Sequence, residues 1–274
     1  MALNVGYFRT WYGAFQATRN VAVNPATDYD EFCITAPVDA RLPNSGERLC
    51  GLFDIKPAKF GQVDNLVTQL SNFGTRSQVY NGVDVTTTAR FGRGTQVSGG
   101  LSVGRTVDDN CVLVNSPQDV RPGFCKIAPS WGSGTQVKLM AIHRLPWAFE
   151  SSVIYQNFSG IENSPMITVS NAAIAPSLGR NLSSCGAAAV CNQNVTVDLV
   201  PAGTMYEPRI QQIDIRVGRL VQFDRYRIRG NFDVANLFNA NGVLNVQRAY
   251  GGSYLNAIQI IGGRLMKVGL QFDF

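Results

Sequence analysis

The chain has 274 residues, of which 45% are hydrophobic and 16% are charged, and its formal net charge is +5. This hydrophobic content excludes a disordered chain, and the scattered Lys and Arg residues argue against nucleic acid as a partner. No apolar run reaches the roughly 18 to 20 residues that a membrane-spanning helix needs, so any membrane-spanning segments must be strands.

The first predicted strand runs from Leu3 to Phe15 and is rich in aromatic and β-branched residues. A long connection without regular pattern follows up to Ser77. It contains an acidic cluster at Asp28, Asp30 and Glu31, but its spacing does not fit a calcium-binding EF-hand loop. We therefore expect a solvated loop and no metal site, and the sequence assigns this loop no role.

The remaining strands are predicted from alternation of apolar and polar residues, since side chains of a strand point alternately to opposite faces. Short turns such as Gly92-Arg93-Gly94 join some of them, and long polar connections join the others. The predicted strands are Gln78–Phe91, Gln96–Arg105, Thr135–Leu145, Phe149–Phe158, Gln211–Gln222, Arg225–Leu237 and Ala257–Phe274.

The connections alternate between long and short along the chain, and every cysteine lies in a long one. Pairing of sequence neighbours is the simplest arrangement, although about 15 connectivities are possible, and disulfides would indicate an oxidising compartment. The candidates are Cys33 with Cys50, Cys111 with Cys125, and Cys185 with Cys191. Long external loops and short periplasmic turns are typical of bacterial outer-membrane barrels.

The sequence therefore predicts an all-β protein, an antiparallel transmembrane β-barrel segment of about eight strands with long extracellular loops. Apolar strand faces would contact lipid and polar faces would line a lumen. Arginine facing lipid at mid-depth costs about 2 to 4 kcal/mol, so charged strand residues should point inward. The candidates are Asp214, Arg216, Arg225, Arg227, Arg229 and Asp233, for which a structural charge network is favoured over contact with a solute.

Several stretches carry a resemblance to a known family. They are Tyr80-Asn81-Gly82-Val83-Asp84-Val85, Gly100-Leu101-Ser102-Val103-Gly104-Arg105, Ala175-Pro176-Ser177-Leu178-Gly179-Arg180-Asn181-Leu182, Phe232-Asp233-Val234-Ala235-Asn236-Leu237-Phe238-Asn239 and Gly263-Arg264-Leu265-Met266-Lys267-Val268-Gly269. Together they resemble the last strands of TonB-dependent outer-membrane receptors, especially the Oar-like group with an N-terminal carboxypeptidase-regulatory-like domain. The last eight residues, 267–274, also resemble a barrel assembly signal, through Lys267, Gly269, Phe272 and Phe274.

The resemblance implies that residues 1–274 form a single C-terminal segment of a barrel of about 22 strands, without the plug domain or a signal peptide. Such a segment would lie in the cell outer membrane, contact its lipid and engage the barrel assembly machinery. TonB would act only through the missing N-terminal plug region. The loops would help to capture a scarce solute that the sequence does not identify, no cofactor is expected, and the last strand should have an unpaired edge.

Three other interpretations are open. One is a soluble extracellular β-sandwich, in which the apolar strand faces would pack against a second sheet. A self-contained small outer-membrane barrel, acting as an adhesin or structural protein, would have to pack several arginines inside and would need an export signal. An enzyme is not expected, because the only histidine, His143, has no nucleophile motif near it. Coding sequence upstream of Met1 that continues into further barrel strands would separate the receptor from the small barrel.

Overall fold

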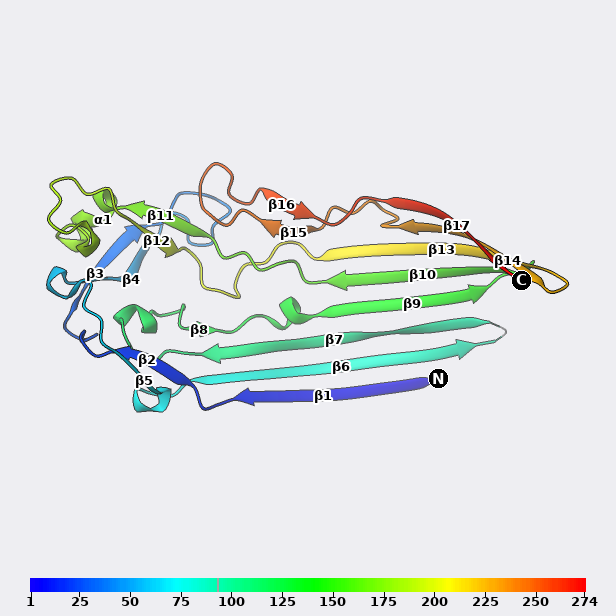
Figure 1. Ribbon diagram of the computed structural model, residues 1–274, viewed down its shortest axis with the longest axis horizontal. Helices are drawn as coiled ribbons and strands as arrows, with labels where there is room; N and C mark the ends of the chain where they lie inside the picture. Colours follow the sequence, from blue (N-terminus) through cyan, green and yellow to red (C-terminus); the bar gives the residue numbers. More distant parts are fainter. Residues whose placement is uncertain (93) are drawn as a thin grey trace.

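The computed structural model describes residues 1–92 and 94–274 of the chain. It is an all-β structure of antiparallel strand pairs with one short helix, α1 (Asn171–Leu178). Long strands fill one half of the elongated molecule, and their short turns lie at the same end as both chain termini (Figure 1). The other half is a cap, which we define as residues 13–76, 110–135, 159–209 and 236–264.

The long strands form one antiparallel sheet in the order β1-β6-β7-β9-β10-β13-β14-β17, with the short β8 (Lys126–Ile127) paired to the end of β7. Each of these eight long strands corresponds to one predicted strand, within a few residues at either end except for the last. Their bounds are β1 (Ala2–Tyr12), β6 (Ser77–Phe91), β7 (Thr95–Asp109), β9 (Gln136–Arg144), β10 (Phe149–Phe158), β13 (Ile210–Phe223), β14 (Tyr226–Ala235) and β17 (Leu265–Asp273).

The register of the sheet gathers apolar residues on one face. Directly opposite residues of antiparallel neighbours share a face, and one such row runs Val5, Val85, Leu101, Val137. We call this side the apolar face and the opposite side the polar face. On the apolar face the following side chains are all exposed: Val5, Val83, Leu101, Leu139, Val153, Val217, Phe232 and Val268.

The sheet is open. In the described part of the chain, β1 pairs only with β6 and β17 pairs only with β14, so these two strands are the ends of the strand order. Their outward edges carry backbone groups that no neighbouring strand satisfies.

The turns between paired long strands are short because residues in left-handed conformations reverse the chain there. Trp147 and Ala148, each with φ 59°, join β9 to β10, and Asp224, with φ 51°, joins β13 to β14. Gly92, with φ 47°, begins the turn after β6. Positive φ at such positions matches the twist of the flanking strands.

The sequence predicted about eight strands, and this count was too low, because the long connections also contain strands. They contain hairpins whose strands have 4 to 8 residues, together with α1 and several single turns of 3₁₀ helix. The hairpins are β2 (Gln16–Asn20) with β5 (Asn65–Gln69), β3 (Tyr29–Thr35) with β4 (Arg48–Ile55), β11 (Met166–Ser170) with β12 (Asn194–Asp198), and β15 (Val243–Val246) with β16 (Ala257–Ile260).

The main buried cores lie in the cap. One forms where α1 and the β11–β12 hairpin pack against the β3–β4 hairpin, and it includes Phe32, Leu52, Ile174 and Val197. A second contains Leu42, Leu199 and Tyr254, so the last long connection packs against the first and third. The cap is therefore one structure built from segments that are distant in the sequence.

The final strand is shorter than predicted. Residues 257–260 form β16 in the cap, and β17 begins only at Leu265. Between them the chain is held by the preceding loop: the Asn236 side chain donates to Gly262 O (2.8 Å), and Arg264 N donates to Asn239 Oδ1 (2.9 Å). The alternation of Ala257–Ile260 thus belongs to a separate hairpin.

Several aromatic residues lie at or near the ends of the long strands. Trp11, Tyr12, Trp147 and Phe223 are exposed there. Tyr80 differs, because it lies on the polar face, where its ring covers Gly82 of its own strand and Gly104 of β7. A side chain at either glycine would collide with that ring, so Tyr80 is a packing residue.

None of the helices in the described residues is long and apolar enough to cross a membrane.

Candidate functional site

Each sequence-neighbouring cysteine pair forms a disulfide, and each disulfide lies in a different long connection. Cys33–Cys50 staples the β3–β4 hairpin across 17 residues of sequence. Cys111–Cys125 closes the second connection across 14 residues, and Cys185–Cys191 closes the third across 6 residues. All three therefore stiffen the cap.

Removing the longest of these disulfides, as Cys33→Ser with Cys50→Ser, should lower the free energy of opening of the cap by about 3 kcal/mol, because the unfolded loop regains its entropy. Cys185→Ser with Cys191→Ser should lower it by about 2 kcal/mol, because the closed loop is shorter. Native-state hydrogen exchange of cap amides measures both values. Equal loss of protection in the long strands would contradict the assignment of the disulfides to cap stability.

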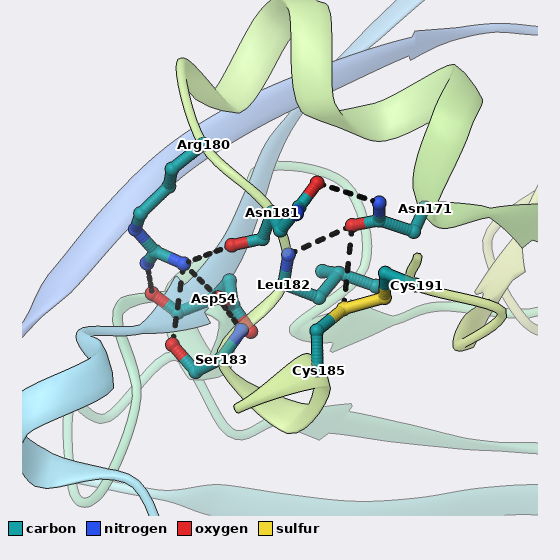
Figure 2. Close-up of a disulfide and its surroundings, with 8 residues drawn as sticks. All are labelled: Asp54, Asn171, Arg180, Asn181, Leu182, Ser183, Cys185 and Cys191. Atoms are coloured by element: carbon teal, nitrogen blue, oxygen red, sulfur yellow. Dashed lines mark hydrogen bonds and ion pairs between the residues drawn. A yellow bond between two sulfur atoms is a disulfide. The ribbon is translucent and has the colours of Figure 1, made fainter. Parts of the chain in front are cut away.

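A dense hydrogen-bond cluster around Arg180 joins the first and third connections. Its guanidinium pairs with the carboxylates of Asp30 (2.9 Å) and Asp54. It also donates to Ile55 O (3.0 Å) and Asn181 O (2.9 Å). Figure 2 shows the contacts of Arg180 with Asp54, Asn181 and Ser183, beside the Cys185–Cys191 disulfide. Because its donors meet carboxylates and carbonyls of the protein itself, Arg180 has a structural role.

Buried polar groups near Arg180 are also satisfied within the protein. The buried Asn171, the first residue of α1, donates to Asn181 Oδ1 (2.8 Å) and accepts from Leu182 N (2.8 Å) (Figure 2). Ser183 N donates to Asp54 Oδ2 (2.9 Å). These bonds fix the chain between α1 and the third disulfide against the β3–β4 hairpin.

The acidic side chains of the first connection are also bonded to other groups of the cap. Asp28 accepts from Asn24 N (2.8 Å), and this bond, with Lys59 nearby, lowers the pKa of its carboxyl. Asp30 pairs with Arg180, and Glu31 accepts from Gly51 N (2.9 Å). Within residues 1–92 and 94–274 no group of acidic, histidine or cysteine side chains is arranged to hold a metal ion.

Replacing Arg180 by Met should destabilise the cap by about 2 to 3 kcal/mol, because Asp30 and Asp54 would lose their partner while partly buried. Urea unfolding followed by cap hydrogen exchange measures the loss. The control is Lys56→Met. The Lys56 ammonium lies 3.9 Å from Asp30 and its side chain is 45% exposed, so its loss should cost less than about 1 kcal/mol. Similar losses from both variants would show that Arg180 is not a central contact.

A cavity of about 280 Å³ lies where the second and third connections meet. Residues from the end of β7 and the segment around the Cys111–Cys125 disulfide form most of its wall, and the end of β12 adds Asp198. It is lined by Asp108, Asn110, Gln118, Asp119, Arg121, Phe124, Cys125, Ile127 and Asp198. The first connection reaches it too, since Phe53 N donates to Gln118 Oε1 (3.3 Å).

Arg121 is the most unusual residue of this cavity, because it is only 6% exposed. It follows a 3₁₀ turn (Pro117–Val120), and its aliphatic stem crosses Gly51, where an added side chain would come within 3.3 Å of Arg121 Cγ. Its guanidinium lies 3.6 Å from the centre of the Phe124 ring. The local fold therefore places the positively charged guanidinium of Arg121 inside the protein.

The hydrogen bonding of Arg121 is sparse. In the described part of the chain its side chain makes a single hydrogen bond, a long one of 3.5 Å to Asp198 O, and no ion pair. Burial lowers the pKa of its guanidinium, and the charge of Asp198 opposes that effect. Asp108 is not available to it, because Arg76 already binds that carboxylate (2.6 Å). Arg121 thus retains N–H donors without a protein partner.

The predicted lumen charges fall on or beside the polar face. Arg216 pairs with Asp233 opposite it, and Lys267 lies opposite Asp233 on β17, so three strands share one charged row. Arg227 and Arg229 lie opposite Asp273 and Gln271.

The other two predicted charges have different surroundings. Asp214 accepts from Gln212 Nε2 (2.8 Å) and from Asn236 N (2.7 Å), so it anchors the start of the last loop. Arg225 lies in the turn after β13, outside both strands, and its guanidinium contacts the Tyr226 ring at 5.1 Å from the centroid. The open sheet encloses no lumen, so a lumen-facing role for this set stays a prediction.

The four residues of the predicted assembly signal lie at the C-terminal edge of the sheet. Lys267 and Gly269 point to the polar face, opposite Asp233 and Asn231, and Phe272 points to the apolar face opposite Ile228. Phe274 follows the strand and is exposed. His143 lies near the end of β9, where its Nδ1 is 2.7 Å from Thr95 Oγ1.

Sequence reasoning missed Arg121 and Arg180 as residues of interest. Arg180 lies in one of the stretches that carry the family resemblance, but that likeness assigned it no role. Arg121 lies between Cys111 and Cys125 in Arg121-Pro122-Gly123, which reads as an ordinary surface turn. Only the packing of the three disulfide-bonded connections shows that these two arginines differ from ordinary surface arginines.

The fold and its sites define a class: an all-β protein with one broad, amphipathic antiparallel sheet and a disulfide-stapled cap at one end. No protein-family model and no curated protein matches the chain.

Proposed function

We propose that this chain forms the C-terminal part of the barrel wall of a TonB-dependent outer-membrane receptor for active uptake of a scarce solute. In this proposal the long strands cross the membrane and the cap lies outside the cell. The apolar face contacts lipid, and the polar face lines the passage. The cap contributes to capture of the solute.

The observation that carries the proposal is the exposed apolar face. A water-soluble sandwich would cover such a face with a second sheet, whereas the buried cores of this chain lie mainly in the cap. Single exposed apolar residues are common, but a continuous apolar surface across eight long strands marks a contact with lipid or another apolar partner. The charged row of Arg216, Asp233 and Lys267 on the opposite face fits a wet passage.

The open strand order favours a wall segment over a self-contained small barrel. A small barrel of these strands would pair β1 with β17, and in the described residues those strands pair only with β6 and β14. Closure by further strands would satisfy both edges. The Oar-like group remains the proposed relative on the strength of the stretches quoted above.

The position of the cap relative to the sheet supports its role outside the cell. All three disulfides lie at the cap end, and the opposite end carries short turns and both termini (Figure 1). Outer-membrane barrels have long external loops and short periplasmic turns. Disulfides in an external cap would also be kept oxidised by the surroundings.

A pair of arginine substitutions on neighbouring residues of β7 tests the lipid contact. Leu101→Arg places a charge on the apolar face and should destabilise the protein in lipid vesicles by about 2 to 4 kcal/mol. Ser102→Arg places the same charge on the polar face opposite Asp84 and should cost less than about 1 kcal/mol. Urea unfolding of both variants in vesicles gives the two values.

Fractionation of cells that express the full-length protein provides the second measurement. The wild-type protein and Ser102→Arg should sediment with outer membranes, and Leu101→Arg should be depleted there. Equal stability and equal fractionation of the two variants would reject the lipid-facing assignment and with it the proposed function.

A further inference from the structure

We propose that the cavity beside Arg121 binds a small zwitterion of the α-amino-acid class, whose carboxylate meets Arg121 and whose ammonium group meets Asp198. The inference rests on the proposed function, because it names the class of solute that the cap would capture. It uses residues of the second and third connections, and the first connection supports them through Gly51 and Phe53.

The first step is the contrast between two arginines of one cap. Arg180 has carboxylates of Asp30 and Asp54 as partners, whereas Arg121 is more deeply buried and has one long hydrogen bond. The unpaired nitrogens of Arg121 are not fully enclosed by protein, so they face the cavity that Arg121 lines. A guanidinium fork with free donors is suited to bind a carboxylate with two parallel hydrogen bonds. The N–H donors of Arg121 that lie at the cavity therefore suit the carboxylate of a small ligand.

The acidic residues of the wall determine what kind of anion fits. Asp108 is neutralised by Arg76, and one oxygen of Asp119 accepts from Asn115 N (2.9 Å) and Ser116 N (3.0 Å). Asp198 makes no side-chain hydrogen bond within the described ranges, 1–92 and 94–274, yet it lines the same cavity. A multiply charged anion such as phosphate would be repelled by these carboxylates, whereas a ligand with its own cation beside its carboxylate pairs with both charges.

The size and the rigid walls of the cavity also fit a small ligand. The volume of about 280 Å³ lies just below the range of roughly 300 to 1,000 Å³ that is typical of drug-sized ligands, so it suits a small molecule. Phe124 covers one side of the guanidinium, and the Cys111–Cys125 disulfide holds the adjoining wall. Such preorganisation reduces the entropy lost on binding.

The first test replaces Arg121 by Met and measures L-alanine binding to the complete chain, refolded in detergent micelles with its disulfides formed, by isothermal titration calorimetry. Affinity should fall by about 10- to 100-fold, the value of losing hydrogen bonds to a charged group. Stability of the unliganded cap should stay the same or rise, because an apolar side chain replaces an unpaired buried charge. Arg180→Met is the matched control, in which cap stability falls.

The second test separates the two charges of the ligand. Asp198→Asn should weaken L-alanine binding by about 10-fold or more, because the ammonium group loses its partner. It should leave the affinity for propionate unchanged or higher, because propionate has the carboxylate without the ammonium. Inorganic phosphate should not compete with L-alanine for the wild-type protein.

Three results would overturn the inference. They are no heat of binding with L-alanine in a cap that shows wild-type hydrogen-exchange protection, equal affinity of wild type and Arg121→Met, or loss of cap stability in Arg121→Met comparable with that in Arg180→Met. Failure of the proposed function is distinguishable, because it is read from Leu101→Arg and Ser102→Arg in vesicles. A chain that binds L-alanine without entering membranes would keep this site and reject the barrel.

Discussion

Cross-strand register is the constraint on which this structure depends. Because residues directly opposite each other share a face, a continuous ladder from β1 to β17 keeps Val5, Leu101 and Val268 on one surface and Asp233 on the other. A shift of one residue in a single pairing would turn every apolar side chain beyond it to the wrong side. The separation of apolar and charged side chains onto opposite faces of the sheet follows from that ladder.

The cap shows how one residue type takes two roles in one small structure. Arg180 satisfies its donors within the protein, so its charge joins the β3–β4 hairpin to the segment after α1. Arg121 has its stem packed over Gly51 and its guanidinium against Phe124, but its donors are not satisfied in the same way. Three short disulfide loops make this possible, because they hold the cap together without requiring every polar group to contribute to its stability.

The sequence predicted the long strands well and the cap poorly, for a physical reason. Alternation over nine or more residues, as in β14 and β17, places apolar and polar side chains on opposite faces of a strand, whatever lies elsewhere in the chain. Hairpins such as β15–β16 depend on contacts with distant connections, and their short strands carry no distinct period. Cysteine spacing suggested the disulfides, but no local pattern predicted that Arg121 would be buried or that Asp198 would line the same cavity.

The two unpaired edges of the main sheet determine when strand pairing must occur relative to membrane insertion. Hydrocarbon offers no hydrogen-bond partners, and each unsatisfied backbone group there costs several kcal/mol. The outer edge of β1, which spans Ala2–Tyr12, and that of β17 would each bring a row of such groups into the lipid. Under the proposed function, neighbouring strands must therefore reach these edges before or during insertion. If the sheet stays in water before insertion, its two unpaired edges would pair with strands of other copies of the chain.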